Sequence, residues 1–277
     1  MSAKRSVHAE DLAFALATAR SAGRVLLRRY GRLFSGAVSS KRRQRHNLVT
    51  LADTEAETLI VERLSKKYPA HAILTEEAGA QGARGAGARW IVDPLDGTIN
   101  FVHEIACFSV SIALERDGEV VAGVVHAPLL RETFVASKGG GAWSGRERIR
   151  VSETGDLRDA LLATGFPYDR TQARWDNRAN FNRLAHSGRG IRRLGSAALD
   201  LAYVAAGRFD AFWELKLKPW DVAAGALLVR EAGGRVTDVA GGGDWLMGGH
   251  VVATNGRLHE AVRRRLRIPG ARVSRRN

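Results

Sequence analysis

The 277-residue sequence predicts an α/β fold in which helices and sheets pack in layers. Three observations support this prediction: helical spacing of apolar residues near the N-terminus, short apolar runs between residues 72 and 136, and mixed patterns after residue 150. Hydrophobic residues make up 45% of the chain and charged residues 26%, which excludes a disordered protein. We expect one folded unit over residues 1–267, with lobes of about 1–150 and 151–267, and a basic, disordered tail over residues 268–277.

The first half begins with two predicted helices and continues with strands. Apolar residues recur at helical spacing over residues 12–30, and a basic loop follows near residues 35–47. Thr50 and Asp53 have the spacing of a capping box at the start of the second helix, which Pro69 ends. Short apolar runs then predict strands at Ala72–Thr75, Trp90–Val92, Ser109–Leu114, Val120–His126 and Thr133–Ala136.

The remaining segments predict one loop and a mixture of helices and strands. Ala78–Ala88 is rich in glycine and alanine, which is typical of a mobile loop. Strands are predicted at Leu161–Phe166, Phe209–Leu215, Val236–Val239 and Val251–Thr254. Helices are predicted over Ser196–Ala206, from Pro219 to Gly233, and over Leu258–Leu266.

Cysteine content and charge limit the class of protein. The single cysteine, Cys107, excludes a disulfide scaffold, and no apolar run approaches the roughly 18 residues that span a bilayer. Glu10 and Asp11 interrupt the only stretch similar to a secretory signal, so we expect a cytoplasmic protein without a membrane segment.

The formal charge of +14 is concentrated over residues 41–45 and 263–277. These clusters are either solvated surfaces or patches that attract nucleic acid, weakly, or phosphorylated substrates.

The densest candidate site is the segment Asp93-Pro94-Leu95-Asp96-Gly97-Thr98-Ile99-Asn100-Phe101. Two carboxylates follow an apolar run and therefore lie at the end of a strand, where they can bind Mg²⁺. Gly97 allows a ligand to approach the backbone closely, and a short helix starting there would direct free N–H groups at an anion. The alternative is an ordinary turn and helix cap, which explains Asp96 but not Asp93.

Three further acids stand at comparable positions. Glu76 and Glu77 follow the strand that ends at Thr75, and because neighbouring strand residues point to opposite faces, we expect only one of them to face the site. Asp221 follows Trp220 at the start of a helix, where it is either a ligand or a favourable charge at the helix N-terminus.

These segments together resemble the inositol monophosphatase family. The resemblance rests on two signatures, Asp93–Phe101 and Trp220–Gly225, and on two further site segments, Leu48–Asp53 and Thr75–Glu77. The segments Gly195–Leu201 and Leu217–Asp221 look closest to the bacterial inositol-1-monophosphatases. It covers about residues 8–267. Ile99 departs from the threonine that is frequent in the family, and Lys41, Arg42 and Arg43 compete for the role of an upstream lysine.

The resemblance implies a layered α/β/α/β/α sandwich and a single catalytic unit that hydrolyses myo-inositol 1-phosphate with Mg²⁺, two or three ions per site. It places Glu76, Asp93 and the carbonyl of Leu95 around one metal and Asp93, Asp96 and Asp221 around a second. It assigns Thr98, oriented by Asp53, and Glu76 to positioning the attacking water. It assigns phosphate and sugar-alcohol binding to Asp96, Gly97, Thr98, Gly195, Ser196, Ala197, Glu214 and Asp221. Lithium inhibition and a homodimer are also implied.

Other interpretations stay open at this point. Fructose-1,6-bisphosphatase, histidinol-phosphatase and adenosine bisphosphate phosphatases share the fold and metal site of this family. A different class is an RNA- or transcription-associated regulatory protein that uses the basic surface, for which the charge of +14 is the motivation.

The basic tail yields the first testable prediction. Truncation after Ile268 removes Arg272, Arg275 and Arg276 and lowers the formal charge from +14 to +11. We expect kcat for phosphate release to stay within about twofold, because the tail lies outside every motif. Binding to a labelled oligonucleotide should weaken and lose part of its salt dependence, because fewer cations displace counterions. A collapse of turnover would place the tail at the active site instead.

Overall fold

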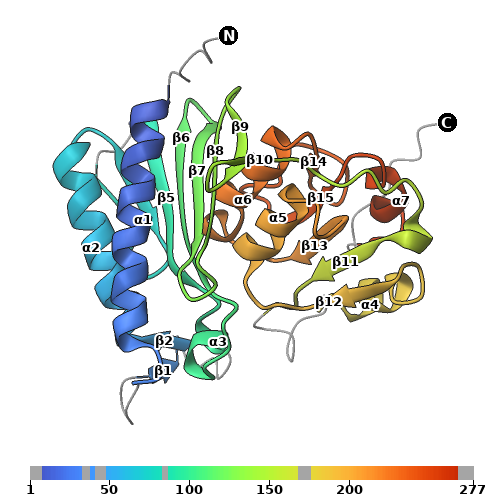
Figure 1. Ribbon diagram of the computed structural model, residues 1–277, viewed down its shortest axis with the longest axis horizontal. Coiled ribbons are helices and arrows are strands. Elements are labelled where there is room, and N and C mark those ends of the chain that lie inside the picture. Colours follow the sequence, from blue (N-terminus) through green and yellow to red (C-terminus); the bar gives the residue numbers. More distant parts are fainter. Residues whose placement is uncertain (1–7, 33–37, 41–47, 83–86, 168–175, 268–277) are drawn as a thin grey trace.

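The computed structural model describes residues 8–32, 38–40, 48–82, 87–167 and 176–267, and arranges them in five layers. In Figure 1, helices α1 (Ala9–Arg29) and α2 (Leu51–Lys67) cover the outer face of a large sheet, and α5 (Ala197–Ala205) and α6 (Pro219–Glu231) lie between it and a smaller sheet. Helices α4 (Arg178–Leu184) and α7 (His259–Arg263) cover the far side. The predicted α/β/α/β/α sandwich is therefore confirmed.

The large sheet has eight strands in the order β10-β9-β8-β7-β6-β5-β3-β4. All neighbouring strands pair antiparallel except β3 and β5, which are parallel. The strands are β3 (Ala72–Thr75), β4 (Gly79–Gln81), β5 (Ala88–Asp96), β6 (Ser109–Arg116), β7 (Glu119–Ala127), β8 (Glu132–Ser137), β9 (Gly141–Ser144) and β10 (Glu147–Ile149). A separate two-stranded sheet joins β1 (Val38–Ser40) to β2 (Leu48–Thr50).

Side chains of alternating strand residues fill the cores on both faces of the large sheet. On β5, Trp90 and Val92 pack with the helices α1 and α2, whereas Ile91 faces α5 and α6. The capping box predicted at the start of α2 is confirmed, because the Thr50 hydroxyl accepts from the backbone N–H of Asp53 and the Asp53 carboxylate accepts from that of Thr50.

Small residues let α6 approach α5 and the large sheet closely. A Cβ at Gly225 of α6 would lie 2.5 Å from the Cβ of Leu201 on α5, and one at Gly123 of β7 would lie 3.0 Å from the Cα of Ala224. The first distance leaves no room for a side chain at Gly225, and the second would require Ala224 to shift by a few tenths of an ångström. The N-terminus of α6 is thereby held beside the end of the large sheet.

The smaller sheet has five strands in the order β12-β11-β13-β15-β14. They are β11 (Leu161–Thr164), β12 (Gly190–Arg192), β13 (Ala211–Leu215), β14 (Arg235–Thr237) and β15 (His250–Thr254), preceded by a 3₁₀ turn over Leu157–Asp159.

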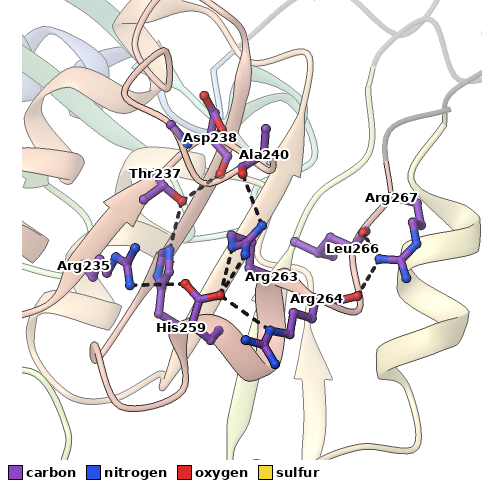
Figure 2. Close-up of polar contacts among 11 residues, drawn as sticks. Arg235, Thr237, Asp238, Ala240, His259, Arg263, Arg264, Leu266 and Arg267 are labelled. Atoms are coloured by element: carbon purple, nitrogen blue, oxygen red, sulfur yellow. Dashed lines mark hydrogen bonds and ion pairs between the residues drawn. The ribbon is translucent and has the colours of Figure 1, made fainter. Parts of the chain in front are cut away.

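Polar contacts fix α7 to this sheet (Figure 2). Buried His259 contacts the hydroxyls of Thr237 and Thr254 at 2.9 and 3.1 Å. The Glu260 carboxylate pairs with Arg235 on β14 and also with Arg263 of its own helix.

Several elements differ from the sequence-based expectations. The last helix ends at Arg263 rather than Leu266, and part of the expected loop Ala78–Ala88 forms β4, paired with β3. Strands β9, β10 and β12 and helix α4 were not expected, because each is short and has no clear apolar periodicity.

The Lys41–Arg45 cluster and the tail over residues 268–277 lie outside the described residues. Within the described ranges, no helix has the length and apolar character needed to cross a membrane.

Candidate active site

A bulge near the end of β5 positions the two central acids. Sequence reasoning ended this strand at Val92, whereas the structure extends it to Asp96. Asp93 pairs with Ser111 and Asp96 with Ser109, so three steps along β5 oppose two along β6. The interruption falls at a proline, which has no N–H for the ladder. Both carboxylates are therefore held by the sheet rather than by a free loop.

Three carboxylates converge between the large sheet and α6. Oxygen atoms of Asp93, Asp96 and Asp221 lie within 4.8 Å of one another, and both β5 acids are buried. The Asp93 carboxylate accepts from the N–H of Leu95 at 2.9 Å, and the Asp221 carboxylate accepts from the N–H of Lys218 at 2.6 Å. Asp221 therefore caps its helix and faces the cluster at the same time, so its two interpretations are compatible.

The N-terminus of α5 holds Asp96 in place. One of its oxygens accepts from the Ser196 hydroxyl at 2.6 Å and from the N–H of Ala198 at 2.8 Å. Burial raises the pKa of Asp96 to about 6, although these two hydrogen bonds lower it. Ser196, expected on the sugar-alcohol side, is fully buried with its hydroxyl committed to Asp96.

The electrostatics of the cluster favour a bound cation. Burial raises the pKa of Asp93 well above its usual range, and repulsion from Glu76, Asp96 and Asp221 raises it further. The pKa of Asp221 is raised by burial and then by Asp96 and Glu76. Closely spaced carboxylate oxygens are the ligands that Mg²⁺ prefers, and a divalent cation would remove the repulsion between them. The donor set therefore fits the expected metal.

A second polar unit connects α2 with α3 (Thr98–Val102). The Thr98 hydroxyl lies 3.2 Å from one oxygen of buried Asp53 and 3.2 Å from the carbonyl of Leu95. The other Asp53 oxygen accepts from Thr50. Gly97, which precedes α3, has φ of 99°, and a Cβ there would lie 2.9 Å from the carbonyl oxygen of Cys107. Only glycine fits this turn.

Glu57 is a functional candidate that sequence reasoning missed. It is buried on α2, one turn after Asp53, and its two oxygens accept from the N–H groups of Glu77 and Ala78 at 2.9 Å each. These bonds fix the turn that carries Glu76. The signal in the sequence is a pair of acids four residues apart on an otherwise apolar helix face.

Hydrogen bonds join the two lobes across the site. The Asn100 side chain donates to the carbonyls of Cys107 and Leu194 at 2.5 and 2.7 Å. On β6, the Ser109 hydroxyl contacts that of Ser196 at 3.2 Å, and the Ser111 hydroxyl donates to the carbonyl of Trp220 at 3.1 Å. The contacts to Leu194, Ser196 and Trp220 could not be predicted from the sequence, because each links segments far apart in the chain.

A cavity of about 670 Å³ opens beside the carboxylates. Of the expected site residues, its lining includes Glu76, Asp96, Gly195, Ala197, Glu214 and Asp221. Glu77 also lines it, contrary to the expected alternation, because β3 ends at Thr75 and the pleat does not continue through the turn. Burial raises the pKa of Glu214 to about 8, against the effect of Arg193.

Carboxylate repulsion predicts an unusual stability profile for Asp93→Asn. In metal-free folded protein the pKa of Asp93 is raised, whereas in the unfolded chain the same carboxyl group has the ordinary pKa of about 4. The contribution of Asp93 to the free energy of unfolding therefore falls as pH rises above about 4. The melting temperature of the variant should therefore exceed that of the wild type by about 3 °C or more at pH 8. The difference should be smaller at pH 5. Excess Mg²⁺ should reverse the order at pH 8. Equal melting curves at all pH values would contradict this.

Glu57 should control metal affinity through the Glu76 turn. Glu57→Gln replaces one accepting oxygen with a donor that faces an N–H, so we expect Mg²⁺ affinity, measured by titration calorimetry, to fall about tenfold. Glu55→Gln is the control, because Glu55 lies on the same helix but pairs with Arg29 at the surface. Equal affinities for both variants would rule out the positioning role.

Known proteins resemble this chain in sequence over most of its length. Residues 8–268 match the inositol monophosphatase family. The Nus factor SuhB of Pseudomonas aeruginosa is 48% identical over 255 residues, covering 91% of this chain and 93% of that protein. An inositol-1-monophosphatase of Mesorhizobium japonicum is 45% identical over 251 residues, covering 91% and 94%.

Solved structures agree with this relationship. The extragenic suppressor protein SuhB of Bartonella henselae superposes with a TM-score of 0.87 at 42% identity, covering 95% of this chain and 100% of that one. An inositol monophosphatase from Anabaena superposes with a TM-score of 0.83 at 39% identity, covering 92% and 94%. The chain therefore belongs to the inositol monophosphatase family.

Proposed function

We propose that the protein is a Mg²⁺-dependent phosphomonoesterase that hydrolyses myo-inositol 1-phosphate and related sugar-alcohol phosphates. The observation that carries this proposal is the cluster of Asp93, Asp96 and Asp221 beside the 670 Å³ cavity. Membership in a metal-dependent phosphatase family supports the reaction class, and the roles of the individual residues are part of the proposal.

Five residues would hold the metal ions. Glu76, Asp93 and the carbonyl of Leu95 would bind one ion, and Asp93, Asp96 and Asp221 would bind a second. When bound, Mg²⁺ supplies positive charge that offsets the charge of the phosphate ester and of an incoming nucleophile. This matters because phosphate monoester hydrolysis is among the slowest uncatalysed reactions.

Thr98 and Asp53 would orient the attacking water. Because the Thr98 hydroxyl can donate its hydrogen to Asp53, its lone pairs are free to accept a hydrogen bond from water. Glu76 would accept a second hydrogen bond from the same water, which directs an oxygen lone pair toward phosphorus. The N–H groups of Gly97 and Thr98 would hold the phosphate. No histidine base is needed for this arrangement.

The cavity lining favours a polyol as the leaving group. Gly195, Ala197 and Glu214 line this cavity and would contact the sugar-alcohol part of the substrate. Arg193, Lys216 and Lys218 line the same cavity, so basic as well as acidic side chains surround the leaving group. Fructose 1,6-bisphosphate remains the alternative substrate on this fold, since basic side chains suit a second phosphate.

Phosphate release from a panel of esters tests the proposal. The wild type should hydrolyse myo-inositol 1-phosphate faster than histidinol phosphate, and chelation should abolish activity. Asp93→Asn should lower kcat by at least about 10²-fold and more than Asp221→Asn, because Asp93 would bridge both metals. Near-normal turnover of Asp93→Asn at saturating Mg²⁺ would contradict the metal assignment.

Family resemblance supports further parts of this proposal. They are a single catalytic unit over residues 1–267, a homodimer, inhibition by lithium at the ion site of Asp96 and Asp221, and a cytoplasmic location. Lithium carries half the charge of Mg²⁺ and would offset the phosphate less well.

A second candidate function is association with transcription. The observations that favour it are the name of a 48% identical relative, Nus factor SuhB, and the formal charge of +14 on this chain. A basic surface would attract RNA through its phosphates. The oligonucleotide measurement on the truncated chain tests this function separately from phosphate release.

A further inference from the structure

Asp200 is a buried acid in the cavity that the proposed mechanism does not use. It lies on α5, one turn after Ser196, and is 1% exposed. Among the described residues, five buried side-chain atoms have no hydrogen-bond partner: Tyr68 Oη, His71 Nδ1, Trp90 Nε1, Arg116 Nε and Asp200 Oδ1. Of these residues, Asp200 is the one that lines the 670 Å³ cavity.

The surroundings of Asp200 are electrostatically unfavourable for a carboxylate. Burial raises its pKa well above the usual range, and repulsion from Glu214 and Asp96 raises it further, whereas Arg193 lowers it. Glu214 and Arg193 line the same cavity. Asp200 is outside the group formed by Asp93, Asp96 and Asp221, whose oxygens lie within 4.8 Å of one another. The metal cluster therefore does not account for it.

Asp210, in the same lobe, is a buried aspartate with a structural role and can be compared with Asp200. It is also buried, at 6% exposure, but its carboxylate accepts from the Ser152 hydroxyl at 2.5 Å and from the N–H of Leu161 at 2.6 Å. Buried carboxylates that stabilise a fold have partners of this kind. Asp200 Oδ1 has no such partner among the described residues, so hydrogen bonds within the fold do not account for this oxygen.

We propose that Asp200 is a specificity-determining residue that accepts hydrogen bonds from hydroxyl groups of a polyol phosphate, next to Glu214. This inference rests on the proposed function and adds a residue to its substrate contacts. A neutral hydroxyl supplies a hydrogen-bond donor to Asp200 without adding charge to a lining that already holds both acids and bases. Two neighbouring carboxylates can accept from adjacent hydroxyls of one ring.

The test compares esters that do and do not carry hydroxyl groups. Asp200→Asn keeps the side-chain volume but replaces one accepting oxygen with a donor and removes the charge. With Mg²⁺ present, kcat/KM for myo-inositol 1-phosphate and fructose 1,6-bisphosphate should fall about tenfold or more through KM. For p-nitrophenyl phosphate, which has no hydroxyl, it should stay within about twofold. The melting temperature should be unchanged or higher, because a buried carboxyl group whose ionisation is unfavourable is replaced by a neutral amide.

Asp210→Asn is the matched control. Because Asp210 is fully partnered, this variant should melt at a lower temperature while the ratio of kcat/KM between polyol and p-nitrophenyl esters stays at the wild-type value. Equal losses on both ester classes, or an unchanged KM for the polyol esters, would overturn the role of Asp200 and leave the phosphatase proposal intact. Absence of phosphate release from every ester by the wild type would instead overturn both.

Discussion

Mutual repulsion among three closely spaced carboxylates, two of them buried, is the constraint on which the rest of this site depends. Asp93, Asp96 and Asp221 lie closer together than free carboxylates in water would, and burial strengthens their repulsion. Each is held by a backbone or hydroxyl donor: Leu95 for Asp93, Ser196 and Ala198 for Asp96, and Lys218 for Asp221. The sheet and two helix N-termini thus maintain an arrangement that a divalent cation would stabilise.

The two lobes meet where this cluster forms, and their packing explains why. Tight contact between α6 and the large sheet, through Gly123 and Ala224, brings the start of α6 beside the bulge of β5. The hydroxyls of Ser109 and Ser111 project from the strand paired with this bulge and contact the segments that begin α5 and α6. The site is consequently shared between sheet and helices, and its geometry depends on the packing of both lobes.

How much of this arrangement could be predicted depends on the range of each interaction. The capping box of Thr50 and Asp53 is local, so its spacing predicted the observed hydrogen bonds. The Asp93–Asp96 spacing likewise indicated a metal site, although not the bulge that extends the strand. Interactions over long sequence separations, such as that of Glu57 with the turn after β3, could not be predicted. The periodicity of apolar residues indicates local secondary structure and does not show which distant segments come into contact. The unpartnered state of Asp200 follows from tertiary packing and could not be read from its position on an apolar helix.

Proton release on metal binding tests the central claim most directly. If repulsion keeps part of the carboxylate cluster protonated in metal-free protein, Mg²⁺ must displace those protons as it binds. Titration calorimetry at pH 7 in buffers of different ionisation enthalpy measures this number. We predict release of about one proton or more per chain, and less in Asp93→Asn. Tight Mg²⁺ binding without proton release would contradict the claim that carboxylate repulsion governs this site.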